Sequence, residues 1–270
     1  MTSTKGAYAA IHGLQLYYEI HGQGEPLLLL HGGLNNVTLL GDTLTQLATT
    51  RQVIAVDLQG HGRTADIDRP LRYESMADDM AALIRQLGFA QVDVMGYSLG
   101  GGTALRIAIQ HPTLVRKLVL ISVACKRTGS YPEVLAAMDQ MSGAAAPFMQ
   151  GAPIYQSYVQ LSPTPDNFPQ LLDKLGDLLR QPYDWSAEVA GLTMPVLLVF
   201  ADADSVMSNH MVEFYQLLGG GQRDAGWDGA HKPLTQLAIL PGQTHYDIFA
   251  ALLLVPVVTP FLAAPLPSRA

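Results

Sequence analysis

The pentapeptide Gly96-Tyr97-Ser98-Leu99-Gly100 is the most informative stretch of this chain. It follows an apolar run, residues 92–95, that is typical of a buried strand, and it precedes residues 101–111, whose pattern predicts a helix. A strand can turn sharply into a helix only where small residues flank the turn, because the two elements approach each other closely. The glycines on both sides of Ser98 therefore predict a strained turn that presents the serine hydroxyl at the positive end of the helix.

Apolar runs of strand length alternate with helical patterns on both sides of this turn. Residues 8–11 and 14–20 flank His12-Gly13 and predict an antiparallel hairpin at the edge of a sheet. The runs beyond it are apolar throughout, as expected of strands covered on both faces. The expected strands are residues 26–30, 53–56, 92–95, 118–121, 196–200 and 237–240, and the expected helices are residues 38–48, 74–87, 101–111, 211–218 and 247–254. This alternation predicts an α/β fold with a parallel sheet and right-handed crossovers, in one domain over residues 1–270.

Residues 125–192 interrupt the alternation. They are rich in Pro, Met, Tyr and Gln, and their amphipathic pieces predict a helical insertion above the sheet, a lid within the same domain. The apolar side chains of this lid either line a pocket for an acyl group or form the packing core of the lid itself. They are Met138, Met141, Phe148, Met149, Tyr155, Tyr158, Leu161 and Phe168.

A serine hydroxyl is a poor nucleophile at neutral pH unless a base lies beside it and a third group orients that base. His245 follows the expected strand 237–240, and two aspartates, Asp202 and Asp204, follow the expected strand 196–200. The carboxyl ends of parallel strands meet at one edge of a sheet, so these side chains are expected near Ser98. Asp204 is favoured as the orienting group because it lies further beyond its strand, and Asp202 would then cap the following helix or turn.

Attack by the serine creates an oxyanion that requires fixed N–H donors. The backbone of Leu99 is one expected donor, and the second is expected from the turn His31-Gly32-Gly33, at Gly33 or at Leu34. An ordinary strand-to-helix turn is the alternative interpretation of this tripeptide. His31 itself is expected to be structural, as is the segment 57–64, in which an aspartate and an arginine would brace neighbouring loops.

Composition excludes several classes of protein. The chain has 270 residues, is 49% apolar and carries a net charge of −7, which argues against binding to nucleic acids or anionic membranes. Its single cysteine, Cys125, is expected to be a buried apolar residue and not a nucleophile. Neither a metal-binding nor a nucleotide-binding motif occurs, so no metal and no cofactor is expected. The first residues lack a signal-like apolar core and no run reaches the ~20 apolar residues of a membrane helix, so a cytoplasmic location is expected, with the oligomeric state open.

The ordered set of these motifs resembles the α/β-hydrolase family from about residue 8 onward. The resemblance implies an α/β-hydrolase fold with a mostly parallel eight-stranded sheet flanked by helices and a helical lid inserted after the sixth strand. It implies Ser98, Asp204 and His245 as a catalytic triad and Gly33 and Leu99 as oxyanion donors. Independently of the resemblance, the residues expected near the substrate are Leu34, Tyr97, Met138, Met141, Phe148 and Tyr158. Two positions depart from the family pattern. Ala201 replaces a usual glycine, which leaves Asp202 open as the acid, and Tyr246-Asp247 stands where relatives often have an apolar residue.

The expected activity is hydrolysis of small, fairly apolar carboxylic esters through an acyl-serine intermediate. A serine nucleophile excludes the branches of the family that use an aspartate. Residues 199–206 and 237–248 are similar to small bacterial esterases, and some relatives open N-acyl homoserine lactones. Lactone opening, perhydrolysis or carbon–carbon bond hydrolysis on the same triad is the alternative, and a non-catalytic ligand-binding protein is a second one. The expected partner is a small ester or lactone.

Overall fold

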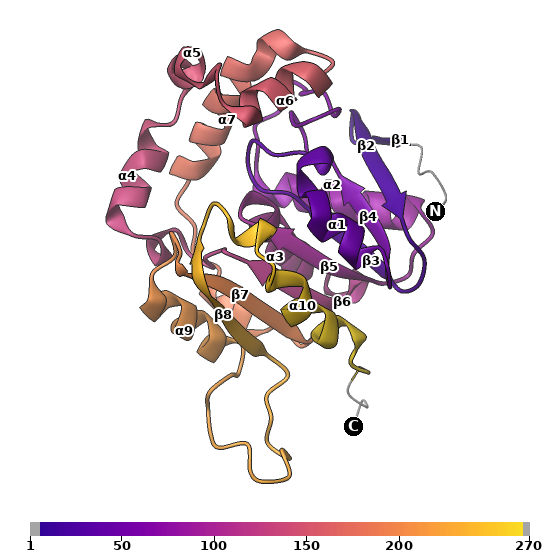
Figure 1. Ribbon diagram of the computed structural model, residues 1–270, viewed down its shortest axis with the longest axis vertical. Helices are drawn as coiled ribbons and strands as arrows, with labels where there is room; N and C mark the ends of the chain where they lie inside the picture. Colours follow the sequence, from indigo (N-terminus) through magenta and orange to yellow (C-terminus); the bar gives the residue numbers. More distant parts are fainter. Residues whose placement is uncertain (1–5, 267–270) are drawn as a thin grey trace.

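Eight strands form a single sheet at the centre of the computed structural model, which describes residues 6–266. Their order is β1-β2-β4-β3-β5-β6-β7-β8 (Figure 1). The strands are β1 (Ala7–Ile11), β2 (Leu14–His21), β3 (Pro26–Leu30), β4 (Gln52–Val56), β5 (Val92–Tyr97), β6 (Val115–Ile121), β7 (Val196–Ala203) and β8 (Gln236–Thr244). β1 and β2 pair as a hairpin, β2 is antiparallel to β4, and every pair from β4 to β8 is parallel. The predicted mostly parallel α/β sheet is confirmed.

The central strands are apolar throughout because helices cover both faces of the sheet. In β3, Leu28 and Leu30 belong to one core cluster and Leu27 and Leu29 to the other, as the two-residue period of a strand requires. Side chains of α2 (Tyr73–Gln86), α3 (Leu99–Gln110) and α9 (Ser208–Leu217) enter the first cluster, and those of α1 (Gly41–Leu47) and α10 (Leu254–Ala263) enter the second. Each fully buried leucine stabilises the fold by roughly 1.5–3 kcal/mol relative to an exposed one.

Two predicted helices have different bounds in the structure. α3 begins at Leu99, two residues before the expected start, because the turn at Ser98 leads directly into the helix. The expected helix over residues 38–48 is divided into a short 3-10 helix, Val37–Leu40, and α1. The division falls at Gly41, whose φ of 52° lies in the left-handed region that glycine favours.

The expected closing helix over residues 247–254 is wrong. The structure has a 3-10 helix at Ile248–Ala250 and then α10, which begins at Leu254. Pro256 follows shortly after the expected end of the helix, at a place where proline often interrupts a helix. Pro256 instead lies in the first turn of α10, where a backbone N–H has no partner within the helix and proline is tolerated.

The segment between β6 and β7 is helical, as predicted. It contains α4 (Pro132–Gln140), α5 (Ala146–Met149), α6 (Pro153–Leu161), α7 (Phe168–Arg180) and α8 (Ser186–Ala190), and α4 to α7 lie beyond one end of the sheet (Figure 1). The same segment contains short 3-10 helices at Arg127–Gly129, Gly143–Ala145 and Pro165–Asn167, and a further one, Pro112–Leu114, lies between α3 and β6. The two ends of the insertion are tied together, since the N–H of Trp185 donates to the carbonyl of Cys125 and the N–H of Arg127 donates to that of Tyr183.

One feature had no counterpart in the sequence analysis. Between α9 and β8, residues 218–235 form an irregular segment that projects from the body of the molecule (Figure 1). Trp227 in this segment is fully exposed. Over residues 6–266, none of the helices has both the length and the apolar character that crossing a bilayer requires.

Candidate functional site

The turn at Ser98 is as tight as the flanking glycines predict. A Cβ atom on Gly96 would lie 2.1 Å from the carbonyl oxygen of Gly100, and a Cβ on Gly100 would lie 2.5 Å from the carbonyl oxygens of Leu30 and His31. Ser98 itself has a φ of 52°, which is strained for a residue with a side chain. The strand and helix on either side fix this conformation, because the Ser98 N–H donates to Ile121 and its carbonyl accepts from Gly102. The hydroxyl is thereby held at the amino end of α3, only partly buried.

Ser98, His245 and Asp204 meet at the carboxyl edge of the sheet, although they are far apart in the sequence. Ser98 follows β5, Asp204 follows β7 and His245 follows β8. The Oγ of Ser98 lies 3.1 Å from Nε2 of His245, and Nδ1 of His245 lies 3.0 Å from Oδ1 of Asp204. Because an ionised carboxylate only accepts, Nδ1 carries the proton and Nε2 is free to accept the serine proton. This tautomer is the one that base catalysis by His245 requires.

The carboxylate of Asp204 accepts several hydrogen bonds. Its Oδ2 accepts from the hydroxyl of Ser122 at 2.5 Å and from the N–H of Ala201 at 3.0 Å. Burial opposes the charged form, but the hydrogen bonds from His245, Ser122 and Ala201 outweigh it and lower the pKa of Asp204 below its usual value. The carboxylate is therefore ionised at neutral pH, as an orienting group must be.

Asp202 has a different environment from Asp204. It is exposed, and its two oxygens accept from the N–H groups of Gly242 and Gln243 at 2.9 and 3.1 Å. These hydrogen bonds lower the pKa of Asp202 and join the end of β7 to the end of β8, just before His245. The second aspartate was expected to cap the following helix or turn, but it instead accepts from the last residues of the neighbouring strand.

Tyr97 contacts His245 through both its hydroxyl group and its ring. Its hydroxyl donates to the backbone carbonyl of His245 at 2.6 Å, and the two rings lie 5.6 Å apart between centroids. Burial is the main cause that raises the pKa of Tyr97, with the charges of Asp204 and Asp247 adding to it. The hydroxyl is thus a permanent donor that fixes the backbone beneath the imidazole.

The turn after β3 lies against the serine turn. A Cβ on Gly33 would lie 3.9 Å from the Cβ of Leu99, so the two predicted oxyanion donors belong to adjacent backbone segments. His31 is fully buried, with Nδ1 donating to the carbonyl of Gly32 at 2.7 Å and Nε2 accepting from the N–H of Leu58 at 3.1 Å. Burial lowers the pKa of His31 to about 4, so this histidine is neutral and structural.

The segment 57–64 braces its neighbours, as predicted. The carboxylate of Asp57 is fully buried and accepts from the N–H groups of Val37 at 2.7 Å and of Arg63 at 2.8 Å. Gly62 has a φ of 51°, and a Cβ there would lie 2.3 Å from the Asp57 carboxylate, so only glycine fits this turn.

Cys125 is fully buried, as expected, but a histidine lies beside it in space. Nε2 of His210 is 3.7 Å from Sγ of Cys125 and accepts a hydrogen bond from the cysteine N–H at 3.2 Å. Burial raises the pKa of the thiol to about 12, so Cys125 is not a thiolate at neutral pH.

The candidate substrate residues of the insertion do not form one group. Tyr158 is 4% exposed, packs its ring against Phe168 and donates to the carbonyl of Thr164, so it belongs to the insertion's own core. Phe148 is 91% exposed on the surface of α5. Met141 and Leu34 are half-buried against the first core cluster, and Met138 is half-buried on α4. A role for these residues in substrate binding stays a prediction.

Two hydroxyls next to the acid were missed by the sequence analysis. Ser122 donates to Asp204, and Oγ of Ser205 lies 2.8 Å from Nδ1 of His245. The position of Ser205 directly after the favoured aspartate was a usable signal. Ser122 directly follows β6 and has a φ of 49°, which nothing in the sequence indicates.

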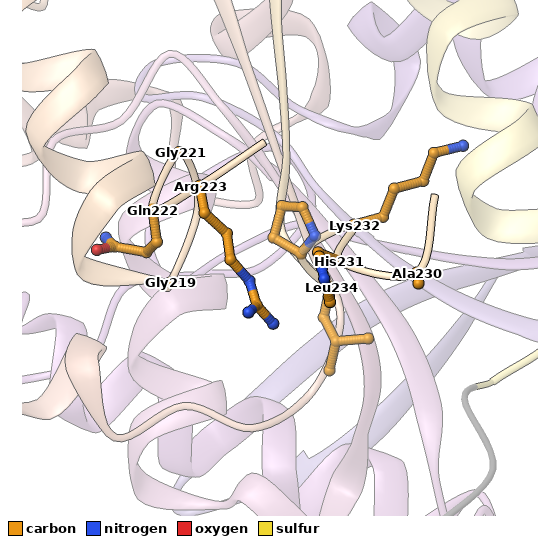
Figure 2. A pocket seen from close by; sticks show the side chains of 9 residues that line it. Gly219, Gly221, Gln222, Arg223, Ala230, His231, Lys232 and Leu234 are labelled. Carbon is orange, nitrogen blue, oxygen red and sulfur yellow. The ribbon is translucent and has the colours of Figure 1, made fainter. Parts of the chain in front are cut away.

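Two cavities lie away from these residues. One, of about 340 Å³, is lined by Arg223, His231, Lys232 and their neighbours in the projecting segment (Figure 2). This segment precedes β8 whereas His245 follows it, so the cavity is at the opposite end of that strand. The other, of about 400 Å³, lies within the insertion beside Tyr155 and Phe168. In the described part of the chain, no cluster of three or more His, Cys, Asp or Glu side chains could hold a metal ion.

Comparison with known proteins gives consistent matches. The family model of the alpha/beta hydrolase fold matches residues 25–154. The chain is 32% identical over 244 residues to a pimeloyl-[acyl-carrier protein] methyl ester esterase of Neisseria meningitidis serogroup B, covering 83% of this chain and 89% of that protein. It is 36% identical over 115 residues to an uncharacterized protein of Mycobacterium bovis, but this match spans only 34% of that protein's length.

Solved structures agree on the architecture. The enol-lactonase from Burkholderia xenovorans LB400 superposes with a TM-score of 0.72 at 20% sequence identity, covering 95% of this chain and all of the other. At this identity the similarity concerns the fold alone. The long match to the Neisseria esterase and the match to the family model show that this chain belongs to the α/β-hydrolase family.

Proposed function

We propose that the protein is a carboxylic ester hydrolase that works through an acyl-serine intermediate. The observation that carries the proposal is the continuous hydrogen-bond path from Ser98 through His245 to Asp204, with distances of 3.1 and 3.0 Å. A base within hydrogen-bond reach of the hydroxyl is the condition for making serine a nucleophile.

The reaction follows from this arrangement in two halves. The Oγ of Ser98 attacks the ester carbonyl while Nε2 of His245 takes its proton, and the new oxyanion accepts hydrogen bonds from the backbone N–H groups of Gly33 and Leu99. The tetrahedral species collapses, the C–O bond to the alcohol breaks, and His245 returns its proton to the departing alkoxide. A water molecule then attacks the acyl-serine with the same base, which releases the carboxylic acid and restores the Ser98 hydroxyl.

The insertion serves as a lid over this site. The side-chain amide of Asn36, in the loop that follows the turn His31-Gly32-Gly33, donates to the hydroxyl of Ser157 on α6 at 2.8 Å. A Cβ on Gly60 would lie 3.3 Å from Leu171 on α7, so the insertion also packs on the segment after β4. These contacts place insertion residues beside the loops that frame Ser98, which supports an apolar acyl pocket between them.

The charges around the site favour an uncharged substrate. Residues 128–173 of the insertion contain no Lys or Arg and four acidic residues, Glu133, Asp139, Asp166 and Asp173. Asp202 near the end of β7 and Asp247, which follows His245, are exposed carboxylates. The Neisseria relative acts, by its name, on an ester attached to acyl-carrier protein. We infer that the present protein takes small neutral esters, because acidic residues outnumber Lys and Arg on the insertion and would disfavour an anionic group.

Ser98→Ala tests the proposal directly. The variant is expected to fold with an unchanged melting temperature and to lose hydrolysis of p-nitrophenyl butyrate, because the nucleophile is absent. A fluorophosphonate probe should label wild-type Ser98 and leave Ser98→Ala unlabelled. Full ester hydrolysis by the variant would refute the acyl-serine mechanism, and a wild-type protein that neither labels nor hydrolyses any ester would indicate a non-catalytic ligand-binding protein.

A substrate panel separates the ester from the alternative reactions. Rates on an acyl homoserine lactone and on a linear ester of the same acyl chain compare lactone opening with ester hydrolysis, since both use the same triad. We expect the linear ester to turn over faster. A lactone rate that exceeds the ester rate would identify a lactonase instead.

A further inference from the structure

The Nδ1 side of the His245 imidazole has two oxygen neighbours, Oδ1 of Asp204 and the hydroxyl oxygen of Ser205. Oγ of Ser205 lies 2.8 Å from Nδ1 of His245, slightly closer than Oδ1 of Asp204 at 3.0 Å. The distance from Ser205 Oγ to Asp204 Oδ1 is longer, 3.4 Å, so the imidazole is the nearer partner of the Ser205 hydroxyl. Since the carboxylate requires the hydrogen on Nδ1, the Ser205 oxygen accepts from the same N–H group.

The backbone holds Ser205 in this position independently of its side chain. The N–H of Ser205 donates to Oδ1 of Asp204 at 2.8 Å, and its carbonyl accepts from the N–H of Tyr131 at 3.2 Å. An isolated bridge between Ser130 and Val206 continues this pairing with the segment that enters the insertion. Removal of the hydroxyl would therefore leave the loop in place, which makes its role separable from folding.

We propose that Ser205 is a positioning residue that orients His245 by sharing its Nδ1 proton with Asp204. This inference rests on the proposed function, because it concerns the same base. With both acceptors present, the imidazole is held on its Nδ1 side by two oxygens, and rotation away from Ser98 breaks two hydrogen bonds instead of one. When the carboxylate is absent, the Ser205 hydroxyl is the hydrogen-bond partner that remains at Nδ1, so Ser205 can replace the part of the role of Asp204 that holds the ring in place.

Labelling by a fluorophosphonate measures this effect without knowledge of the natural ester. The second-order labelling rate of Ser98 depends on His245 as base and is measured on the full chain. Ser205→Ala is expected to lower this rate by roughly two- to tenfold, the range of one neutral hydrogen bond, with an unchanged melting temperature. Ser205→Thr keeps a hydroxyl and should restore most of the rate. Ser208→Ala, an exposed serine on the first turn of α9, is the matched control and should label as the wild type does.

A double-mutant cycle distinguishes proton sharing from a general structural effect. In the wild-type background Asp204 can take the whole proton when Ser205 loses its hydroxyl, so the loss is small. In an Asp204→Ala background Ser205 is the remaining acceptor at Nδ1, so adding Ser205→Ala should lower the labelling rate by a clearly larger factor than it does in the wild type.

Each result decides for or against the inference. Equal factors in the two backgrounds, a wild-type rate for Ser205→Ala, or failure of Ser205→Thr to restore the rate would overturn it while leaving the proposed function intact. A wild-type protein that the probe does not label would overturn the proposed function, and the role of Ser205 as well.

Discussion

The imidazole of His245 is fixed from several directions by single side chains. Asp204 and Ser205 contact its Nδ1 side, Ser98 contacts Nε2, and Tyr97 holds its backbone carbonyl. Proton transfer requires the donor and acceptor to stay within about 2.6–3.2 Å, so this support determines whether the base can act. Asp202 does not contact His245, but it accepts hydrogen bonds from Gly242 and Gln243 at the end of β8, just before His245.

The two aspartates are predicted to respond differently to loss of charge. Asp204→Asn should reduce kcat for p-nitrophenyl butyrate by about 10⁴-fold, because an amide in place of the carboxylate favours the wrong tautomer of His245. Asp202→Asn retains an oxygen that can accept from the backbone at the end of β8 and should change kcat by less than about threefold. Steady-state kinetics of the two variants, made side by side, measure this. A greater loss in Asp202→Asn would transfer the orienting role to that residue.

At the scale of helices and strands, hydrogen bonds at the ends of the elements add to the stability that apolar packing provides. Lys117, near the start of β6, is 2% exposed, and its ammonium group donates to the carbonyls of Phe261 and Leu262 at 2.9 and 2.7 Å and to that of Ala264. These are the last carbonyls of α10, which lack partners within the helix and carry its negative end. Lys117 thus fastens the carboxyl-terminal helix to the sheet. Burial is the main cause that lowers the pKa of this ammonium group.

Lys117→Met tests this contact. Methionine keeps the apolar stem but leaves the carbonyls without a donor, so the free energy of unfolding should fall by about 1.5–3 kcal/mol. Urea denaturation followed by circular dichroism measures the change. Lys232→Met, an exposed lysine in the projecting segment, is the control and should differ from the wild type by less than about 0.5 kcal/mol. Equal stability of both variants would mean that α10 is held by apolar packing alone.

For the whole molecule, charge is distributed unevenly between the two ends of the parallel strands. The side that carries the site has the insertion, in which acidic residues outnumber Lys and Arg, and the exposed carboxylates of Asp202 and Asp247. In the segment that precedes β8, Arg223 and Lys232 are balanced by Asp224 and Asp228. Nine residues of β8 at about 3.3 Å each separate the two regions, well beyond the range of unscreened attraction at physiological salt.

This distribution predicts selectivity against anionic esters. The kcat/KM for p-nitrophenyl butyrate should exceed that for the hemisuccinate of p-nitrophenol, and added salt should narrow the difference. Asp247→Asn removes an exposed charge two residues from His245 and should raise kcat/KM for the anionic ester by about twofold. Asp228→Asn is matched to it, since both carboxylates are exposed and accept from a backbone N–H, and should have no effect. A faster anionic ester in the wild type would contradict the inference of a neutral substrate.

The sequence by itself determined the alternation of strands and helices, the turn at Ser98 and its candidate partners, His245 with either Asp204 or Asp202. These follow from local rules, because fully apolar runs, helical spacing and glycines at a close approach each constrain the chain over a few residues. The same local rules gave the wrong closing helix, since whether Pro256 interrupts a helix or lies in its first turn depends on where the helix begins.

Only the tertiary structure decided which side chains meet across large sequence separations. The contacts of Ser122 and Ser205 with the acid and the base, of Tyr97 with the His245 backbone, and of Lys117 with the end of α10 join segments that are distant in the chain. The sequence also left open whether Tyr158 lines a pocket or packs within the insertion, and in the structure its ring packs against Phe168. Such contacts depend on the register and crossing of whole elements, which no local pattern of residues encodes.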